Sequence, residues 1–461
     1  MWGVLHHDRR LRPHSGDKTA HFPPMTPEAS HSGSLSGPAE PLDITFNQDA
    51  LAQLSAGFGK FGDAFRMSAT VTGAPIYVFS HPEHVRRVLV DNHQNYTKGI
   101  GIERVGILLG KGLMVSEGDL WRRQRRMIQP AFHRDVIAHM LGHIREANQA
   151  LLEKWLVRAD NRDEINVTQD MSDVTLDIVL RSIFGDDLKS MTAAGGANPF
   201  ALLTEETERN LTFAYKFRAL SKLIIDCVTR RRAQSDEHQD LLAMLMAARD
   251  RKTGEAMPDK QLLDEIMTLI VAGHETTASA LNWLWYLLSQ HPEAEQRLHA
   301  EVDALPAPPA TMDEILQLQY ARRVIDETLR LYPPGWLLTR RTIEADCIGG
   351  YDVAANTDVF ISPYLVHRHP EFWPDPERFD PERFTESAAA GRSRFCYLPF
   401  ALGPRACIGE HFAMVEMLVH TAMLARHIRL RYLPKHPLEL ECQVNLRSKR
   451  GIYMLPEIRR P

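Results

Sequence analysis

The chain has 461 residues, and its 54 Lys and Arg residues against 59 Asp and Glu residues give a formal charge of −5. Hydrophobic residues make up 44% and charged residues 25%, which is typical of a folded globular protein and excludes a largely disordered chain. The slightly acidic balance gives no support for a nucleic-acid-binding protein that relies on bulk positive charge. No apolar stretch reaches the roughly 18 residues of a membrane-spanning helix, so we expect no transmembrane anchor and a cytoplasmic location.

Residues 1–42 are rich in His, Pro, Ser and Gly. This composition predicts a flexible N-terminal tail that forms no core. After residue 42 no segment has the composition of a linker, so we expect residues 43–461 to form a single domain, which we predict to be a monomer.

In chain order, the sequence first predicts a strand hairpin over 65–80 with its turn at Gly73-Ala74-Pro75, a helix over 82–92 and a glycine-rich loop over 93–118. Helical periodicity then dominates. The predicted helices cover 119–127, 134–158, 168–184, 200–232, 238–250, 259–291, 293–304, 311–331 and 409–427. Short strands are predicted between 336 and 362 and in the last 35 residues, and 363–408 is predicted to be irregular. The fold class is therefore mainly α with a smaller β region.

The five cysteines are scattered, odd in number and without a C-x-x-C pair, which argues against a disulfide framework. One of them, Cys407, follows a Gly-Pro loop at the predicted start of a helix. Free N–H groups and the helix dipole favour a thiolate there, and Arg405 adds positive charge. A thiolate held in this way suits the axial sulfur ligand of a haem iron. The other four cysteines are expected to be ordinary buried thiols.

Residues Phe400 to Gly409 match every fixed position of F-x-x-G-x-R-x-C-x-G. On this segment the chain resembles the cytochrome P450 superfamily, in its soluble, bacterial-type branch. The resemblance implies the P450 fold, with haem b between the long central helix and the Cys-ligand loop. It also implies that Cys407 is the iron ligand and that Phe400 and Arg405 contact the cofactor.

Two further motifs stand in the order typical of this family. Glu327 and Arg330 form an E-x-x-R motif, and the chain carries two later P-E-R-F boxes. The family joins such a pair to an arginine from the box. Of Arg378 and Arg383 we select Arg383, in the second box, because it lies nearer the cysteine loop. This triad is expected to have a structural role.

The longest predicted helix contains Gly273-His274-Glu275-Thr276-Thr277. The resemblance implies that Glu275 and Thr276 are the acid–alcohol pair that delivers protons during O₂ activation. Thr276 is expected to bond the carbonyl four residues earlier, and Gly273 to thin the helix beside the cofactor. The start of a zinc motif, H-E-x-x-H, is also present, but Ala278 stands where the second histidine is needed.

Cofactor contacts are also predicted outside the cysteine loop and the longest helix. Trp121 and Arg125 share a helix face, and by resemblance both reach a haem propionate. Arg341 is expected to do the same, with the adjacent Arg340 as the alternative. The neighbouring arginines 122, 123 and 126 are expected to form a basic surface that docks an acidic electron donor.

The predicted function is a haem-thiolate monooxygenase that inserts one oxygen atom from O₂ into a C–H bond of an apolar substrate, such as a fatty acid or terpenoid. No reductase sequence follows Cys407, so NAD(P)H is expected to act indirectly, through a ferredoxin or flavodoxin with its reductase. Two alternatives remain: a peroxide-driven haem-thiolate enzyme, and a haem protein without oxygenase activity. Activity with peroxide alone would indicate the first, and gas binding without product the second.

Overall fold

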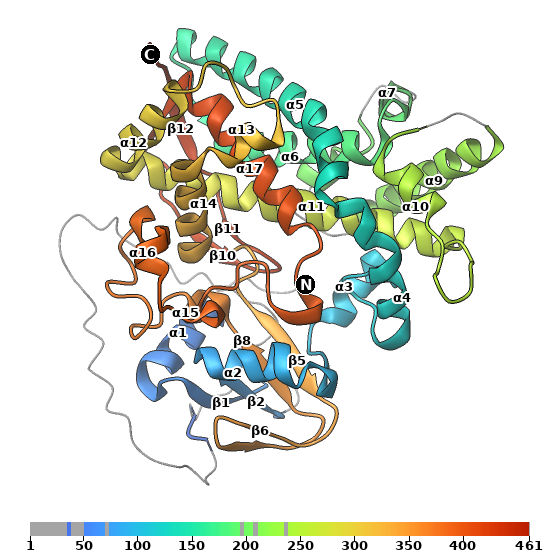
Figure 1. The fold of residues 1–461 in the computed structure, drawn as a ribbon, viewed down its shortest axis with the longest axis vertical. Coiled ribbons are helices and arrows are strands. Elements are labelled where there is room, and N and C mark those ends of the chain that lie inside the picture. Colours follow the sequence, from blue (N-terminus) through green and yellow to red (C-terminus); the bar gives the residue numbers. More distant parts are fainter. Residues whose placement is uncertain are drawn as a thin grey trace.

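The computed structural model describes residues 35–37, 50–69, 73–193, 198–205, 211–234 and 238–460. Its helices form one large layer and its main sheet lies below them, flanked by α1 and α2 (Figure 1). The principal helices are α1 (Ala50–Phe61), α2 (Pro82–Arg86), α3 (Ile102–Leu109), α4 (Gly118–Ile128), α5 (Arg134–Asn161), α6 (Val167–Phe184), α7 (Asp187–Ala193), α8 (Leu202–Glu205), α9 (Leu211–Ala233), α10 (Leu241–Ala247), α11 (Asp259–Gln290), α12 (Pro292–Asp303), α13 (Met312–Leu316), α14 (Gln319–Leu331), α15 (Pro363–Val366), α16 (Glu386–Ala389) and α17 (Glu410–Ala425). The mainly α architecture with a smaller β region is confirmed.

The largest sheet has the strand order β1-β2-β8-β5-β3, in which only β2 and β8 are parallel among the described strands. A three-stranded antiparallel sheet follows the order β4-β12-β9, and β6–β7 and β10–β11 are hairpins. The strands are β1 (Ala64–Ser68), β2 (Pro75–Phe79), β3 (Tyr96–Lys98), β4 (Ile165–Asn166), β5 (Leu338–Thr342), β6 (Asp346–Ile348), β7 (Tyr351–Val353), β8 (Asp358–Ile361), β9 (Ile428–Tyr432), β10 (Leu440–Cys442), β11 (Leu446–Ser448) and β12 (Tyr453–Ile458). The hairpin predicted over 65–80 is present as β1 and β2.

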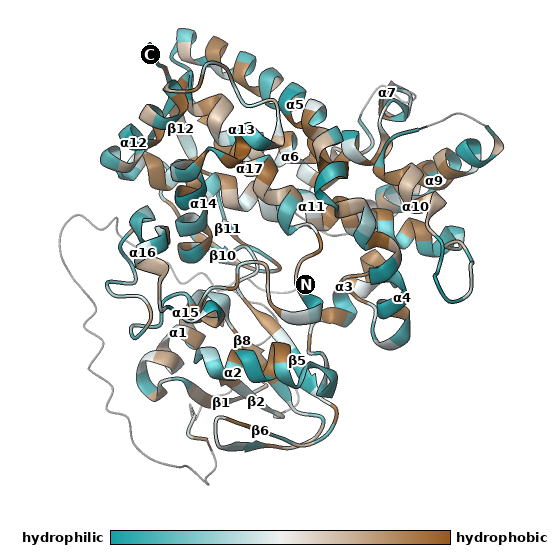
Figure 2. Ribbon diagram, viewed as in Figure 1, coloured by the Kyte–Doolittle hydropathy of each residue, from teal (hydrophilic) through white to brown (hydrophobic). Residues whose placement is uncertain are grey.

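The helix α11 organises the helical layer. Its 32 residues make it about 48 Å long, and it runs through the middle of the layer in Figure 1. Buried apolar residues gather where α5, α6, α11 and α17 meet, and Figure 2 shows that these helices also carry hydrophilic residues. This core fixes α11 and α17, the two helices on which the predicted site depends.

Three predicted elements differ from the structure. The segment 93–118 was expected to be a loop but contains β3 and α3, since Ile102 to Leu109 can form a helix between the left-handed Gly101 and Gly110. The helix expected over 311–331 is divided into α13 and α14. Glu301 causes this division, because its carboxylate accepts the N–H groups of Tyr320 and Ala321 and so caps a new helix start. The helix expected over 200–232 is present as α8 and α9, and part of the intervening segment lies outside the described residues.

The N-terminal prediction also needs a correction. Most of residues 1–42 lie outside the described part of the chain, but Leu35 is buried in the core beside the main sheet. The carbonyl of Ser36 accepts a hydrogen bond from Arg66 N at 3.0 Å. Residues 35–37 are therefore packed against β1 rather than forming a tail without a core.

Candidate active site

The loop before α17 holds Cys407 in place. It contains a short 3-10 turn, Gly403–Arg405, and the N–H of Cys407 donates back to Phe400 O at 2.8 Å. Gly403 has φ +71°, and a Cβ on it would lie 2.0 Å from Leu89 O, so a larger residue would not fit. The backbone of Phe400 thus closes the loop, and its contact with the cofactor stays a prediction. The sulfur is left immediately before the first turn of α17.

The surroundings of the Cys407 sulfur act in opposite directions on its charge. Burial raises the pKa of the Cys407 thiol, whereas hydrogen bonds from the N–H groups of Gly409 and Glu410, together with the charge of Arg125, lower it. A coordinated metal ion would shift this balance, because it deprotonates a thiol ligand outright. The loop can therefore supply a thiolate to a cation bound on its open side.

The helix α4 packs on this loop through its predicted residues. Arg125 Nη1 donates to Ala406 O at 2.9 Å. The guanidinium of Arg405 lies 3.9 Å from the centre of the Trp121 ring, and it also pairs with Glu117. The structure therefore brings Trp121, Arg125 and Arg405 together at the cysteine loop. The expectation that Arg405 charges the sulfur needs correction, because the cation that acts on Cys407 is Arg125.

A cluster of buried cations lies beside these residues. Burial and the charges of Arg405 and Arg340 lower the pKa of Lys98 to about 7, and burial and Arg405 lower the pKa of Arg340 to about 10. Glu117 is the acidic residue that acts on this cluster. Cations gathered away from water are costly unless anions accompany them. The two propionates of haem b have the charge this cluster needs, so the residues present fit that cofactor.

The assignment of Arg341 to this cluster is corrected by the structure. Arg341 Nη2 lies 2.7 Å from Asp358 Oδ2 on the neighbouring strand, and Asp358 is the largest influence on its pKa, which it raises. Side chains alternate along a strand, so Arg340 and Arg341 of β5 point to opposite faces. Arg340 is therefore the arginine of β5 that faces Arg405.

The predicted acid–alcohol pair lies in the middle of α11. Thr276 Oγ1 donates to Ala272 O at 2.9 Å, which is the backbone contact expected from the sequence. Glu275 Oε2 accepts a hydrogen bond from Asn445 Nδ2 at 3.1 Å. Gly273 was expected to thin the helix beside the cofactor, but this was wrong. A Cβ on Gly273 would point toward α6 and lie 3.1 Å from Val179 Cγ2. Gly273 thus permits the close packing of α11 on α6.

The predicted structural triad is assembled in the core. Arg330 and Glu327 form two hydrogen bonds of 2.6 and 2.8 Å, and both side chains have 0% exposure. Arg383 Nε lies 3.4 Å from Glu327 Oε1. The side chain of Arg378, in contrast, is 68% exposed, and only the backbone carbonyl of Arg378 accepts a hydrogen bond from Arg330. Arg330 also donates to His367 O and Pro376 O. The triad therefore ties α14 to the irregular segment that precedes the cysteine loop.

Sequence reasoning missed three residues of the site, Lys98, Glu117 and Asn445, and gave Arg340 only as the alternative to Arg341. Strand alternation could have separated Arg340 from Arg341, since only one of two neighbours can face a given side. Nothing in the local sequence singles out the other three, because each reaches the site from a segment distant in the chain.

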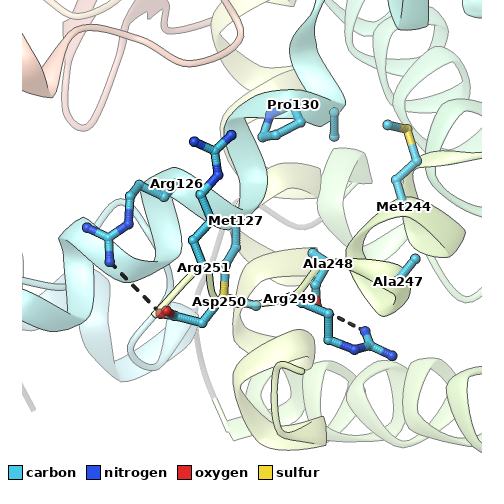
Figure 3. A pocket seen from close by; sticks show the side chains of 10 residues that line it. Arg126, Met127, Pro130, Met244, Ala247, Ala248, Arg249, Asp250 and Arg251 are labelled. Carbon is cyan, nitrogen blue, oxygen red and sulfur yellow. Dashed lines mark hydrogen bonds and ion pairs between the residues drawn. The ribbon is translucent and has the colours of Figure 1, made fainter. Parts of the chain in front are cut away.

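The predicted basic surface on α4 is partly neutralised. Arg123 Nε lies 3.0 Å from Asp250 Oδ2, Arg126 Nη2 lies 3.9 Å from the same oxygen, and Arg122 pairs with Asp119 on the same helix. Asp250 belongs to a rim around a cavity of about 300 Å³ between α4 and α10 (Figure 3). The cavity is lined by Arg126, Met127, Pro130, Ala131, Met244, Ala247, Ala248, Arg249, Asp250 and Arg251. It has an apolar floor and a basic rim and does not include the Cys407 loop.

Comparison with known proteins identifies the family. The family model for cytochrome P450 matches residues 44–196 and 197–454. Cyclooctatin synthase from Streptomyces melanosporofaciens is 36% identical over 403 residues, which cover 84% of this chain and 87% of that protein. The chain belongs to the cytochrome P450 family. The family assignment made from Cys407 and its loop is thereby confirmed.

Further relatives agree with this P450 assignment. Cyclooctat-9-en-7-ol 5-monooxygenase from the same organism is 34% identical over 78% of this chain and 81% of that protein. The plant protein LUTEIN DEFICIENT 5, chloroplastic, from Arabidopsis thaliana is 32% identical over 90% of this chain and 73% of that protein. The crystal structure of the cytochrome P450DA heme domain superposes with a TM-score of 0.82 at 24% identity, covering 93% of this chain and 98% of that one, and supports the fold.

The family identifies the chemistry of the site. The chain is a cytochrome P450 monooxygenase, and membership of the family implies a haem cofactor and redox partners. No helix in the described ranges has both the length and the apolar character needed to cross a membrane. The five cysteines are free thiols; Cys227, Cys396 and Cys442 are buried as expected, whereas Cys347 is exposed, which corrects the prediction that it is a buried thiol.

Proposed function

We propose that this P450 hydroxylates an apolar terpenoid-like substrate at a haem b held by Cys407. The observation that carries the proposal is the joint presence of a sulfur cradled by the N–H groups of Gly409 and Glu410 and a cluster of buried cations beside it. When bound, the haem supplies O₂ activation. Within this scheme the Cys407 sulfur would bind the haem iron, and Arg340, Arg405 and Lys98, with Trp121, would hold the propionates.

The acid–alcohol pair on α11 has the role of holding and moving protons in the site. The Thr276 hydroxyl already donates to Ala272 O, so its oxygen is oriented and keeps its acceptor capacity. Glu275 is oriented by Asn445 and can exchange protons between the site and the protein interior. Retention of both groups favours an O₂-dependent monooxygenase over the peroxide-driven alternative.

The terpenoid assignment is supported by two observations. The two Streptomyces relatives are named for cyclooctatin and for a cyclic alcohol, and the plant relative for lutein. The sequence places the apolar residues Val105, Leu108, Phe200 and Phe213 in segments expected beside the pocket, and of these Val105 and Leu108 are partly buried. Phe200 is fully buried and so belongs to the core, and the side chain of Phe213 lies outside those described. A fatty acid is the other apolar substrate predicted from the sequence.

Electrons are proposed to come from a separate ferredoxin or flavodoxin, with NAD(P)H as the indirect source. Segments 119–126 and 249–255 carry four and three basic residues against one and two acidic ones, in a chain of net charge −5. This local excess of positive charge suits an acidic donor. The proposal also keeps the predicted monomer and cytoplasmic location.

Substrate oxidation tests this proposal. The purified protein would be supplied with NADPH, a ferredoxin and its reductase, and offered cyclic diterpenes, carotenoids and medium-chain fatty acids. We expect an O₂-derived hydroxyl group on a terpenoid, detected by mass spectrometry with ¹⁸O₂. Product from fatty acids alone would contradict the terpenoid assignment, and product with hydrogen peroxide but not with the redox proteins would favour the peroxide-driven alternative.

A further inference from the structure

A strap of residues 99–117 connects β3 to α4 and contains α3 as its middle part. All residues of α3 are described, and among them Leu109 alone is buried, while Ile107 is 82% exposed. The helix therefore gains little from hydrophobic burial. Val105 and Leu108 of α3 pack partly against the core, and the attachments at the two ends of the strap add to this contact.

The first end is attached to the main sheet. The N–H of Ile100 donates to Asp358 Oδ1 at 3.3 Å, and the carbonyl of Ile100 accepts from Thr339 Oγ1 at 3.1 Å. Gly99 lies against the backbone of Arg340, where a Cβ would be 2.8 Å from its N atom. This end of the strap is fixed next to β5 and the cation cluster.

The second end is attached to two consecutive carboxylates of α11. Asp264 Oδ2 accepts from Lys111 N at 2.9 Å, and Glu265 Oε2 accepts from Leu113 N at 2.8 Å. Each of these contacts fixes one backbone N–H group of the strap on a side chain of α11. Glu265 has 0% exposure, so water does not compete for this contact.

Two glycines allow the strap to approach α11 this closely. A Cβ on Gly110 would lie 2.3 Å from Asp264 Oδ1, and Gly110 also has φ +60°. A Cβ on Gly112 would lie 2.1 Å from Thr268 Oγ1 and 2.6 Å from Asp264 O. Since side-chain carbons do not approach other atoms to such distances, any larger residue at Gly112 would push the strap away from α11.

The strap also contacts α4, so it is held between two helices that flank the active site. Gln124 is fully buried, and its Nε2 donates to Lys111 O at 2.7 Å while its Oε1 accepts from Ser116. The next residue, Arg125, contacts the cysteine loop. Along α11, Thr276 lies three turns, or about 16 Å, beyond Glu265 and on nearly the same face. The strap therefore bridges α4, which contacts the Cys407 loop, and α11, which carries Thr276.

We propose that Asp264 and Glu265 form a latch that holds the strap closed beside the haem pocket and so limits the rate at which bulky ligands enter. These two acids are positioning residues, since they act through the strap and not on the reacting atoms. The inference rests on the proposed function only in taking the space next to Cys407 as the haem pocket. Loss of the latch frees residues 102–116 to move as a unit about the attachment at Gly99 and Ile100.

Ligand entry into the holoenzyme tests the latch. D264N and E265Q keep the side-chain shape but replace one carboxyl oxygen by an NH2 group that cannot accept a hydrogen bond, so the double variant weakens both contacts. We expect the association rate of 4-phenylimidazole, measured by stopped-flow absorbance, to rise at least about fivefold in the double variant. The rate for cyanide, which is small enough to pass a closed strap, should change by less than about twofold. Hydrogen exchange of residues 102–116 should become faster.

Matched variants separate the latch from general effects. E301Q makes the same chemical change at a carboxylate outside the strap. Glu301 accepts hydrogen bonds from two backbone N–H groups, and E301Q should leave the association rates of 4-phenylimidazole and cyanide unchanged. G112A should reproduce the latch variants by steric means, whereas G142A, where a Cβ meets nothing, should not. Unchanged 4-phenylimidazole entry in both D264N/E265Q and G112A would overturn the proposal, and so would faster exchange without faster entry. The spectrum of the CO complex of each variant reports on haem–thiolate ligation separately, so failure of the proposed function would be recognised as such.

Discussion

Asn445 Nδ2 donates to Glu275 Oε2 at 3.1 Å, which ties the acid of the acid–alcohol pair to the turn between β10 and β11. The two residues are 170 positions apart in the chain. Asn445 is 9% exposed, so this amide–carboxylate contact is shielded from water. The orientation of Glu275 on α11 thus depends on a residue from the C-terminal strand region.

Replacing Asn445 by Ala is expected to reduce coupling between electron use and product formation. Without the amide, Glu275 loses a hydrogen bond to a charged group, a contact of about 1.5–3 kcal/mol, and samples other rotamers. We expect a severalfold higher ratio of hydrogen peroxide released to NADPH consumed. Q443A is the control, because Gln443 donates to Glu441 on the same hairpin and not to Glu275. Equal coupling in N445A and Q443A would contradict a role for this contact.

Arg340 and Arg341 offer a neighbouring pair for testing the cofactor cluster. R340Q removes a cation that faces Arg405, whereas R341Q removes one that pairs with Asp358. We expect R340Q to lose haem to apomyoglobin about tenfold faster than the unchanged protein, which corresponds to about 1.4 kcal/mol. R341Q should lose it at nearly the unchanged rate. The reverse order would show that Arg341, as the sequence first suggested, holds the propionate.

The Glu327–Arg330 pair predicts a large stability effect. E327A leaves the fully buried guanidinium of Arg330 without its carboxylate, and removal of one partner of a buried pair costs about 3–5 kcal/mol. We expect a clearly lower midpoint of denaturant unfolding in E327A together with poor haem retention. R378A, at an exposed side chain in the other P-E-R-F box, should change the free energy of unfolding by less than about 0.5 kcal/mol. Similar losses in both variants would contradict the choice of Arg383 for the triad.

The comparison of these residues shows what the sequence could predict. Cys407, the E-x-x-R pair and the Glu275-Thr276 pair are local motifs, and the chemistry of each needs only neighbours within one turn or loop. Arg340, Lys98 and Asn445 act across the fold, and their roles depend on strand register and on which face of a strand points inward. The sequence shows where Gly273 lies along α11, but not which neighbour its Cα faces. That neighbour is α6, and its position is set by the packing of the whole helical layer.

A second fold prediction failed for a similar reason. Residues 311–331 have continuous helical periodicity, yet the chain breaks at Leu318, because Glu301 of a different helix caps Tyr320 and Ala321. Local propensity does not contain this contact.

Glu265 predicts a pH dependence of stability. Burial and the charge of Asp264 raise the pKa of Glu265 to about 8, while the N–H of Leu113 acts the other way. The folded state then binds this proton more tightly than the unfolded state. The tighter proton binding stabilises the fold fully at a pH below about 4.5, the pKa of an unperturbed glutamate, and this stabilisation is lost as the pH rises through about 8, the pKa in the folded state. At 1.36 kcal/mol per pKa unit its upper limit is about 5 kcal/mol.

We therefore expect the midpoint of denaturant unfolding to decrease less between pH 5 and pH 8 in E265Q than in the unchanged protein. Denaturant titrations at fixed ionic strength measure this difference. E301Q, at a partly exposed carboxylate, serves as the control. An equal decrease in the E265Q variant and the unchanged protein would show that Glu265 does not take up this proton.

The central claim is that Cys407 binds the haem iron through its sulfur. The most direct measurement is the absorption spectrum of the reduced, purified protein after exposure to CO, compared with that of C407S. We predict a strongly red-shifted Soret band for the unchanged protein and its absence in C407S. A band typical of histidine-ligated haem in the unchanged protein, or the same red-shifted band in C407S, would contradict the assignment.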